Sequence, residues 1–279
     1  MKKRVLKLMS VILVAAFLLT GFVGCGTKPE EEPKTSADST EKTEAQASKL
    51  DEIKQKGVIV MGTNAEFPPF EFRNDKGEVD GFDVAIANEI AKELGVELKI
   101  EDMAFDSLIN ALKSGKINFI AAGMSVTEDR KQNVDFSEEY YSASQKIIVR
   151  KDNNDIKGKA DLVGKKIGVQ EGTTGDTEAS ALETVEMSRF KKAVDAVMDL
   201  KNGKIDAVVL DASPAQVFVN KNDDLKILDE ELTNEAYAIA IDKGNEELVE
   251  VINKVINNLK ESGKYDELVK QYIEEYTGE

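Results

Sequence analysis

Residues 117–130 read INFIAAGMSVTEDR, and this stretch decides how the rest of the chain is interpreted. The apolar run that opens it predicts a buried strand, which Gly123 ends before a polar turn. Ser125 and Thr127 are favoured helix N-cap residues, so a helix is expected to begin near them. Free backbone N–H groups between a strand and a helix can bind a carboxylate. Arg130 could bind the same carboxylate through two N–H groups; the alternative is a surface arginine on a short helix.

Strand and helix patterns alternate before this stretch. Residues 58–61 form an apolar run that predicts a buried strand, and a loop with two prolines follows it. Asp83 is expected to cap an amphipathic helix that ends at Gly95, and Asp106 to cap a second helix. This alternation predicts βαβ units and a mainly parallel sheet. Ligands of such sheets bind at the carboxyl ends of the strands, where the sequence places Asn64.

A second unit of the same kind begins near residue 166. Residues 166–169 predict a strand, and Thr173 and Thr174 follow at the start of the next helix. Residues 205–210 predict another buried strand, which ends in Asp211. The correspondence is architectural and not a sequence repeat. If the strand ends of the two units face each other, a ligand is expected to lie between two lobes.

The polar groups at these strand ends have the charges that a free α-amino acid requires. Arg130 and N–H groups near Ser125 and Thr173 would hold the α-carboxylate, and Asp211 would accept a hydrogen bond from the α-ammonium. Aromatic walls for the ligand side chain would come from Phe67 and Phe105.

Some of these residues also have ordinary structural interpretations. Asp211 could simply be the N-cap of a helix that begins at Ser213-Pro214. Phe67 and Phe105 could simply pack in a hydrophobic core.

The composition excludes several classes of function. The net charge of −16 disfavours nucleic-acid binding. With no histidine and one cysteine, the chain cannot build the usual nitrogen and sulfur metal sites, and Ser–His–Asp and Cys–His catalysis are excluded. The acidic turn near Asn74 does not have the spacing of an EF-hand, because Asp80 and Asp83 fall at the wrong positions. No metal and no cofactor are predicted.

The N-terminal 48 residues are not expected to belong to the fold. Residues 1–24 have the basic start, apolar run and small residues of a secretory signal peptide. Residues 19–25, LTGFVGC, resemble a bacterial lipobox, which implies a lipoprotein cleaved before Cys25 and lipidated there with acyl chains such as palmitate. The alternatives are a membrane-spanning helix, for which the apolar run is short, and a coincidental free thiol. The composition of residues 25–48 predicts a disordered tether, which would connect the folded part to the lipid on Cys25.

Six stretches of the folded part resemble family 3 solute-binding proteins, the polar amino acid class of bacterial ABC importers. They are GTNAEFPPFEF (62–72), GFDVAIANEIAKELG (81–95), FDSLINALKSGKINFIAAGMSVTEDR (105–130), VDFSEEYY (134–141), GVQEGTTGD (168–176) and GKIDAVVLD (203–211). The resemblance implies an α/β, two-lobed, periplasmic-binding-protein-like fold of type II. Each lobe would be a mainly parallel sheet flanked by helices, and the chain would cross twice between the lobes.

The resemblance also implies domain limits and site residues. Lobe 1 would comprise residues 50–142 plus 239–279, and lobe 2 residues 146–236. The matching site positions are Gly123, Ser125 and Arg130 for the carboxylate, Thr173 and Thr174 for contacts of lobe 2, Asp211 for the ammonium, Phe67 for the aromatic wall and Asn64 for a position that senses the ligand side chain.

The expected function is that of an extracytoplasmic, monomeric substrate-binding protein that captures a polar free amino acid by lobe closure. It would deliver the amino acid to a membrane permease and its ATPase. The alternatives are a related dehydratase or lyase that uses Glu66 or Glu171 as an acid–base group, and a sensor that acts through a separate partner. The ligand is not identified: members that bind basic amino acids often carry an acid where this chain has Asn64, and Ala122 and Gly175 replace polar residues of some relatives.

Overall fold

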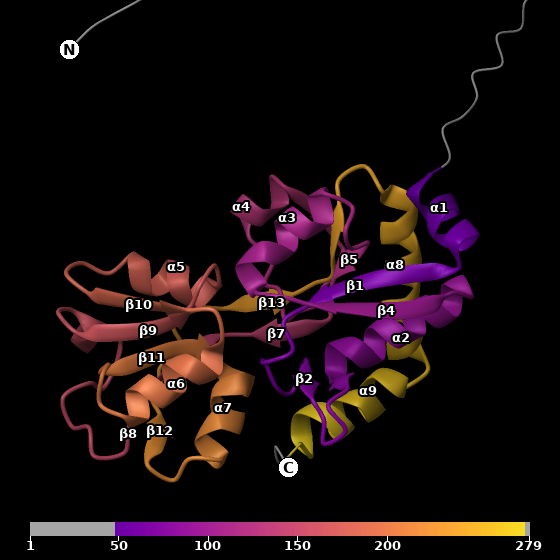
Figure 1. Ribbon diagram of the computed structural model, residues 1–279. Helices are drawn as coiled ribbons and strands as arrows, with labels where there is room; N and C mark the ends of the chain where they lie inside the picture. The colour runs from indigo at the N-terminus through magenta and orange to yellow at the C-terminus, as the bar shows by residue number, and fades with distance from the viewer. Residues whose placement is uncertain (1–47, 277–279) are drawn as a thin grey trace, which may run out of the picture. The chain divides into compact units, whose positions relative to one another are not determined.

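The computed structural model describes residues 48–276, so the predicted signal peptide, Cys25 and nearly all of the predicted tether lie outside the described residues. Residues 48–276 contain two five-stranded sheets, and helices flank each of them (Figure 1). The predicted two-lobed α/β fold is therefore confirmed. In this part of the chain, no helix is both long enough and apolar enough to cross a membrane.

The first sheet contains the predicted strand of the opening stretch. Its strands, in spatial order, are β4 (Glu97–Asp102), β1 (Val58–Thr63), β5 (Phe119–Ile120), β14 (Ala240–Asp242) and β6 (Val134–Phe136). Only β14 runs against its neighbours, so the sheet is mainly parallel, as predicted. The helices of this half are α1 (Lys49–Lys56), α2 (Phe82–Leu94), α3 (Leu108–Lys113), α4 (Glu128–Lys131), α8 (Glu246–Glu261) and α9 (Lys264–Leu268).

The second sheet repeats this arrangement. Its strands, in spatial order, are β10 (Glu186–Phe190), β9 (Lys166–Gln170), β11 (Ala207–Asp211), β8 (Gln145–Arg150) and β12 (Leu225–Ile227). Here only β8 runs against its neighbours. The helices of this half are α5 (Thr174–Ser180), α6 (Ala193–Lys201) and α7 (Ala212–Asn220). Because both sheets have the same strand order, β1 and β5 of the first sheet correspond to β9 and β11 of the second.

Two short strands join the two halves. β7 (Tyr141–Ala143) and β13 (Glu235–Tyr237) pair antiparallel and lie between the two five-stranded sheets (Figure 1). The ring of Tyr237 is fully buried and stacks on Tyr141, and Phe70 meets both of these rings edge-on. The connection therefore has an aromatic core. A separate hairpin, β2 (Phe72–Arg73) with β3 (Val79–Asp80), extends from the first half.

The helices bury the faces that their apolar spacing predicts. In α8 the buried residues are Leu248, Ile252, Val255, Ile256 and Leu259, which recur at the helical period. Glycines in the left-handed conformation end α1 and α2 at Gly57 and Gly95, as the sequence predicts for the second of these.

Three local predictions about element ends are wrong. Asp83 is not an N-cap: Gly81 holds that position, and the buried Asp83 carboxylate points at another part of the chain. Asp106 lies inside a turn of 3₁₀-helix, where its carboxylate pairs with Lys191 at 2.7 Å instead of capping. The strand predicted at 117–122 covers only Phe119–Ile120, because β14 pairs with these two residues alone.

Candidate ligand-binding site

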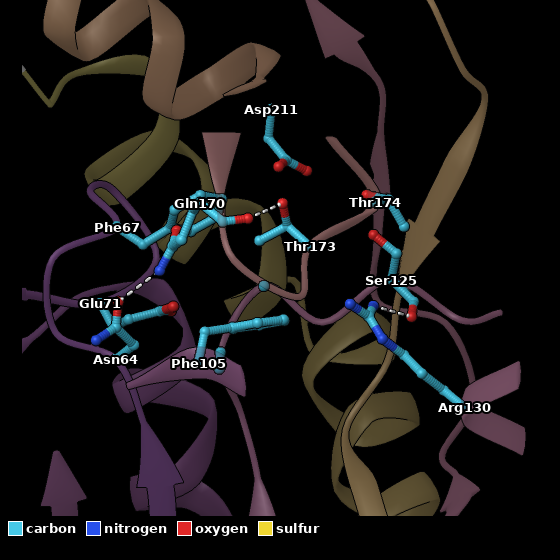
Figure 2. A pocket seen from close by; sticks show the side chains of 12 residues that line it. Asn64, Phe67, Glu71, Phe105, Ser125, Arg130, Gln170, Thr173, Thr174 and Asp211 are labelled. Atoms are coloured by element: carbon cyan, nitrogen blue, oxygen red, sulfur yellow. Dashed lines mark hydrogen bonds between the residues drawn. The ribbon is translucent and has the colours of Figure 1, made fainter. Parts of the chain in front are cut away.

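Side chains from both halves line one pocket (Figure 2). The lining residues are Asn64, Phe67, Glu71, Phe105, Ala122, Gly123, Ser125, Arg130, Gln170, Thr173, Thr174 and Asp211. The structure thus brings together all the residues that the sequence predicts as ligand contacts. Their role as contacts stays a prediction. Glu71 and Gln170 are additional residues that the sequence interpretation missed.

The strand order explains why these residues meet. Asn64 directly follows β1, and Gly123 and Ser125 follow β5. At the corresponding strand ends of the second sheet, Gln170 is the last residue of β9 and Asp211 the last residue of β11. The pocket therefore lies at the carboxyl ends of equivalent strands, where open α/β sheets bind ligands.

Gly123 has to be a glycine. Its φ is +51°, and a Cβ atom there would lie 2.7 Å from Cε1 of Phe67. Its N–H donates to Oδ2 of Asp83 at 2.8 Å, and the hydroxyl of Tyr140 donates to the same oxygen at 2.7 Å. This N–H is therefore already paired within the protein. Asp83 fixes the turn that carries Gly123, and the Gly123 carbonyl is the group that remains for a ligand.

Glu71 and Asp83 form a buried pair of acids. Both side chains are fully buried, and neither the two oxygens of Glu71 nor Oδ1 of Asp83 has a hydrogen-bond donor among the described residues. Burial, followed by the charges of Asp83 and Asp211, raises the pKa of Glu71 well above its usual value, and burial raises the pKa of Asp83 to about 6. A protonated Glu71 can donate to Asp83, which gives both acids a partner.

Arg130 joins the two halves. Thr127 caps α4 by accepting the N–H of Arg130 at 3.2 Å, as predicted for an N-cap residue. The guanidinium donates from Nη1 to the carbonyl of Ser125 at 2.7 Å and from Nη2 to the carbonyl of Gly172 at 3.0 Å, and it lies 5.2 Å from the ring centre of Phe105. Burial lowers its pKa, which the charges of Asp211 and Glu235 oppose, so the group remains a cation.

Asp211 is buried where β11 ends and α7 begins. It occupies the N-cap position of α7, but its side chain makes no capping hydrogen bond, so the interpretation as a simple N-cap does not account for it. The hydroxyl of Tyr237 donates to Oδ1 at 2.5 Å. Burial raises the pKa of Asp211 to about 6, and the Tyr237 hydrogen bond opposes this. The pocket therefore contains a carboxylate and a guanidinium that are not hydrogen-bonded to each other.

Asn64 and Gln170 meet across the pocket. Nε2 of Gln170 donates to Oδ1 of Asn64 at 2.9 Å and to the carbonyl of Lys191 at 3.3 Å. Nδ2 of Asn64 donates to the carbonyl of Met103 at 2.9 Å. Both N–H groups of Gln170 are thus used, and its amide oxygen is the group that remains for a ligand.

Two ion pairs lie at the rim. Glu66 pairs with Lys192 at 2.6 Å, and Asp106 pairs with Lys191 at 2.7 Å, in each case between the first and the second half. Glu66 therefore lies outside the lining and does not take the place of an acid at position 64. Gly175 is also outside the lining: a Cβ atom there would meet Oε1 of Gln145 at 2.7 Å.

Comparison with known proteins gives consistent matches over the folded part. Residues 59–275 match the family described as bacterial extracellular solute-binding proteins, family 3. A probable histidine-binding protein of Campylobacter jejuni is 40% identical over 233 residues, which cover 83% of this chain and 90% of that protein. The arginine-binding extracellular protein ArtP of Bacillus subtilis is 35% identical over 233 residues, which cover 80% of this chain and 88% of ArtP.

The chain is also similar to a solved structure. The arginine-bound form of truncated ArgBP from T. maritima is 50% identical and superposes with a TM-score of 0.73. The match covers 75% of this chain and 99% of that chain.

Proposed function

The chain belongs to the bacterial extracellular solute-binding proteins, family 3, and serves an ABC importer as its amino-acid-binding component; on this premise we propose that its ligand is an α-amino acid with a cationic side chain, and arginine in particular. The proposal rests on one observation above all. Arg130 and Asp211 line the same pocket from opposite halves, and their charges match the carboxylate and the ammonium of a zwitterion.

A cationic side chain fits the remaining charges. Two acids, Glu71 and Asp211, line the pocket against one guanidinium, that of Arg130. An amino acid with a neutral side chain brings no positive charge to Glu71, so that this acid stays protonated. A cationic side chain favours the ionised form of Glu71 and is attracted by it. At the Asn64–Gln170 contact, the free amide oxygen of Gln170 is an acceptor for the N–H groups of a guanidinium. The arginine-binding protein ArtP and the arginine-bound structure of ArgBP support the same ligand.

Capture is proposed to occur by closure of two lobes, residues 50–142 plus 239–279 and residues 146–236, about the β7–β13 connection. The sheet membership of the strands supports these limits. A ligand that contacts Arg130 in one lobe and Asp211 in the other favours the closed arrangement by the added affinity. We further propose a monomer that is anchored to the membrane by lipid at Cys25 and that transfers its ligand to a permease and its ATPase.

Binding without catalysis is proposed. The acids suggested as acid–base groups for a dehydratase or lyase lie at the rim in ion pairs, Glu66 with Lys192 at 2.6 Å and Glu171 with Lys191 at 2.8 Å. Neither of them lines the pocket.

A thermal-shift screen tests the ligand directly. The twenty amino acids, ornithine and cystine are added singly, and L-arginine is expected to raise the unfolding midpoint most, because a ligand that binds only the folded state stabilises it by mass action. Calorimetry with L-arginine, L-lysine and L-glutamine then ranks the affinities. Preference for glutamine over both basic amino acids would contradict the charge argument.

The affinity is expected to fall in acid. The pKa of Asp211 is raised from its ordinary 3.8 to about 6, so that the carboxylate is charged at pH 7.5 and mostly protonated at pH 5. Arginine keeps its α-ammonium over this range, and a protonated Asp211 no longer attracts it, so the Kd is expected to rise about tenfold between these pH values. Calorimetry at both pH values measures the change. The change should become smaller in Asp211→Asn, which lacks this carboxyl group; an unchanged pH profile in this variant would exclude Asp211 as its cause.

The effect of pH on the stability of the protein without ligand has the opposite sign to its effect on the affinity. Because folding raises the pKa of Asp211, the folded state binds more protons than the unfolded state between pH 3.8 and about 6. The contribution of this group to the free energy of unfolding therefore decreases as the pH rises through that window.

A further inference from the structure

Glu235 lies in β13, outside the pocket lining, and contacts both halves of the site. Its Oε2 atom accepts a hydrogen bond from the hydroxyl of Ser125 at 2.5 Å and another from the hydroxyl of Thr174 at 2.8 Å. Ser125 follows β5 of the first sheet, and Thr174 is the first residue of α5 beside the second sheet. One carboxylate oxygen thus binds a hydroxyl from each half.

The surroundings of Glu235 place its charge at the site. Oε1 is buried and has no hydrogen-bond partner within residues 48–276. The charge of the carboxylate opposes the lowering of the Arg130 pKa that burial causes. The adjoining backbone is fixed as well, because the N–H of Val126 donates to the carbonyl of Ala236 at 2.9 Å.

We propose that Glu235 is a positioning residue for the ligand site, which acts through the hydroxyls of Ser125 and Thr174. The proposal rests on the function proposed above and deepens it. A hydroxyl has a single proton, and both of these protons are donated to Glu235. Neither hydroxyl can therefore donate to the ligand's α-carboxylate, which is left to the N–H groups of Arg130 and of the backbone. The hydroxyls present only oxygen lone pairs to a ligand, and Oγ1 of Thr174 also accepts from Nε2 of Gln145 at 3.1 Å.

The hydrogen bonds of Glu235 also link the β7–β13 connection to closure of the two halves. Ser125 and Thr174 belong to different halves, so both can reach one oxygen only when the halves are together. Hydrogen bonds to a charged group are stronger than those between neutral groups. Glu235 therefore contributes to the closed arrangement from within the connection itself.

A double-mutant cycle tests this inference. Glu235→Ala and Glu235→Gln are made in the wild-type chain and in a chain with Ser125→Ala and Thr174→Val, and the Kd for L-arginine is measured by calorimetry. In the wild-type chain, Glu235→Ala is expected to raise the Kd about tenfold and Glu235→Gln less, since glutamine keeps one acceptor. In the chain without the hydroxyls, both changes are expected to stay within about twofold, because the groups through which Glu235 acts are gone.

The matched control is Glu231, an exposed acid of the same segment that pairs with Lys146 at 3.4 Å. Glu231→Ala and Glu231→Gln are expected to leave the Kd within about twofold in both chains. Equal factors for Glu235→Ala with and without the hydroxyls would overturn the inference.

A measurement without amino acid separates this inference from the proposed ligand. Glu235→Ala is expected to lower the thermal unfolding midpoint of the wild-type chain and to leave that of the Ser125→Ala/Thr174→Val chain nearly unchanged. If the wild-type chain does not bind L-arginine, the ligand proposal is wrong, and the unfolding midpoints still test the role of Glu235. A decrease caused by Glu235→Ala only when the two hydroxyls are present supports that role. An equal decrease in both chains refutes it. If Glu235→Ala does not fold, Glu235→Gln gives the same comparison.

Discussion

Replacing Arg130 by alanine is expected to raise the Kd for L-arginine by about thirtyfold or more, as measured by calorimetry. The guanidinium is the one cation that lines the pocket within the described part of the chain, and the pocket also holds Glu71 and Asp211. Without Arg130 the ligand's α-carboxylate would be buried near acids and without a counter-charge. Loss of one partner of such a pair costs about 2–5 kcal/mol, and each 1.4 kcal/mol is about tenfold in Kd.

A matched control separates binding from folding. Arg150 also donates to two backbone carbonyls, those of Leu200 at 3.0 Å and Ile205 at 2.9 Å, but it does not line the pocket. Arg150→Ala is therefore expected to lower the unfolding midpoint and to leave the Kd nearly unchanged. Arg130→Lys should bind with intermediate affinity, because lysine keeps the charge but loses the planar fork. An unchanged Kd in Arg130→Ala would refute the assignment of Arg130 to the carboxylate.

Replacing Asp211 by asparagine is expected to raise the Kd for L-arginine at pH 7.5 by about a hundredfold. Asparagine has nearly the same shape, and its Oδ1 can still accept the hydroxyl of Tyr237, so the fold is expected to remain. The change removes the negative charge opposite the α-ammonium, and hydrogen bonds between charged groups are about twice as strong as neutral ones. The expected loss of about 3 kcal/mol corresponds to that factor.

The role of Asp211 is specific to one group of the ligand, and an analogue without that group tests it. 5-Guanidinopentanoate is arginine without its α-ammonium. Calorimetry should show that Asp211→Asn strongly weakens the binding of L-arginine and weakens the binding of this analogue little or not at all. A loss of equal size for both compounds would mean that Asp211 shapes the pocket without binding the ammonium.

The sequence predicted the parts of the site that follow from strand order. Apolar runs located the ends of β1, β5, β9 and β11, and in parallel units such ends face one region. Asn64, Gly123, Thr173 and Asp211 were identified in this way, and the structure brings them to one pocket. Local periodicity sufficed because each of these residues lies within four positions of a predicted strand.

The residues that the sequence did not reveal depend on contacts between distant segments. Glu71 follows Phe70 and precedes Phe72, which is the pattern of an exposed strand position, but it is fully buried beside Asp83. Asp83 has the sequence pattern of an N-cap, and only the position of Gly123, 40 residues on, shows what its carboxylate binds. Glu235 contacts Ser125 and Thr174 from 110 and 61 residues away. No pattern within one segment contains such information.

The rim ion pairs are expected to make the proposed capture sensitive to the salt concentration of the medium. Glu66–Lys192 and Asp106–Lys191 each join one half to the other, and their lysines are about half exposed. Exposed pairs contribute about 0–1 kcal/mol each and weaken as salt rises, since the Debye length falls from about 30 Å at 0.01 M to about 8 Å at 0.15 M. On the proposed closure mechanism, the fraction of the protein with its halves in contact is therefore expected to be larger in a dilute medium than in concentrated salt. The affinity for the amino acid is then expected to decrease as the ionic strength of the medium rises.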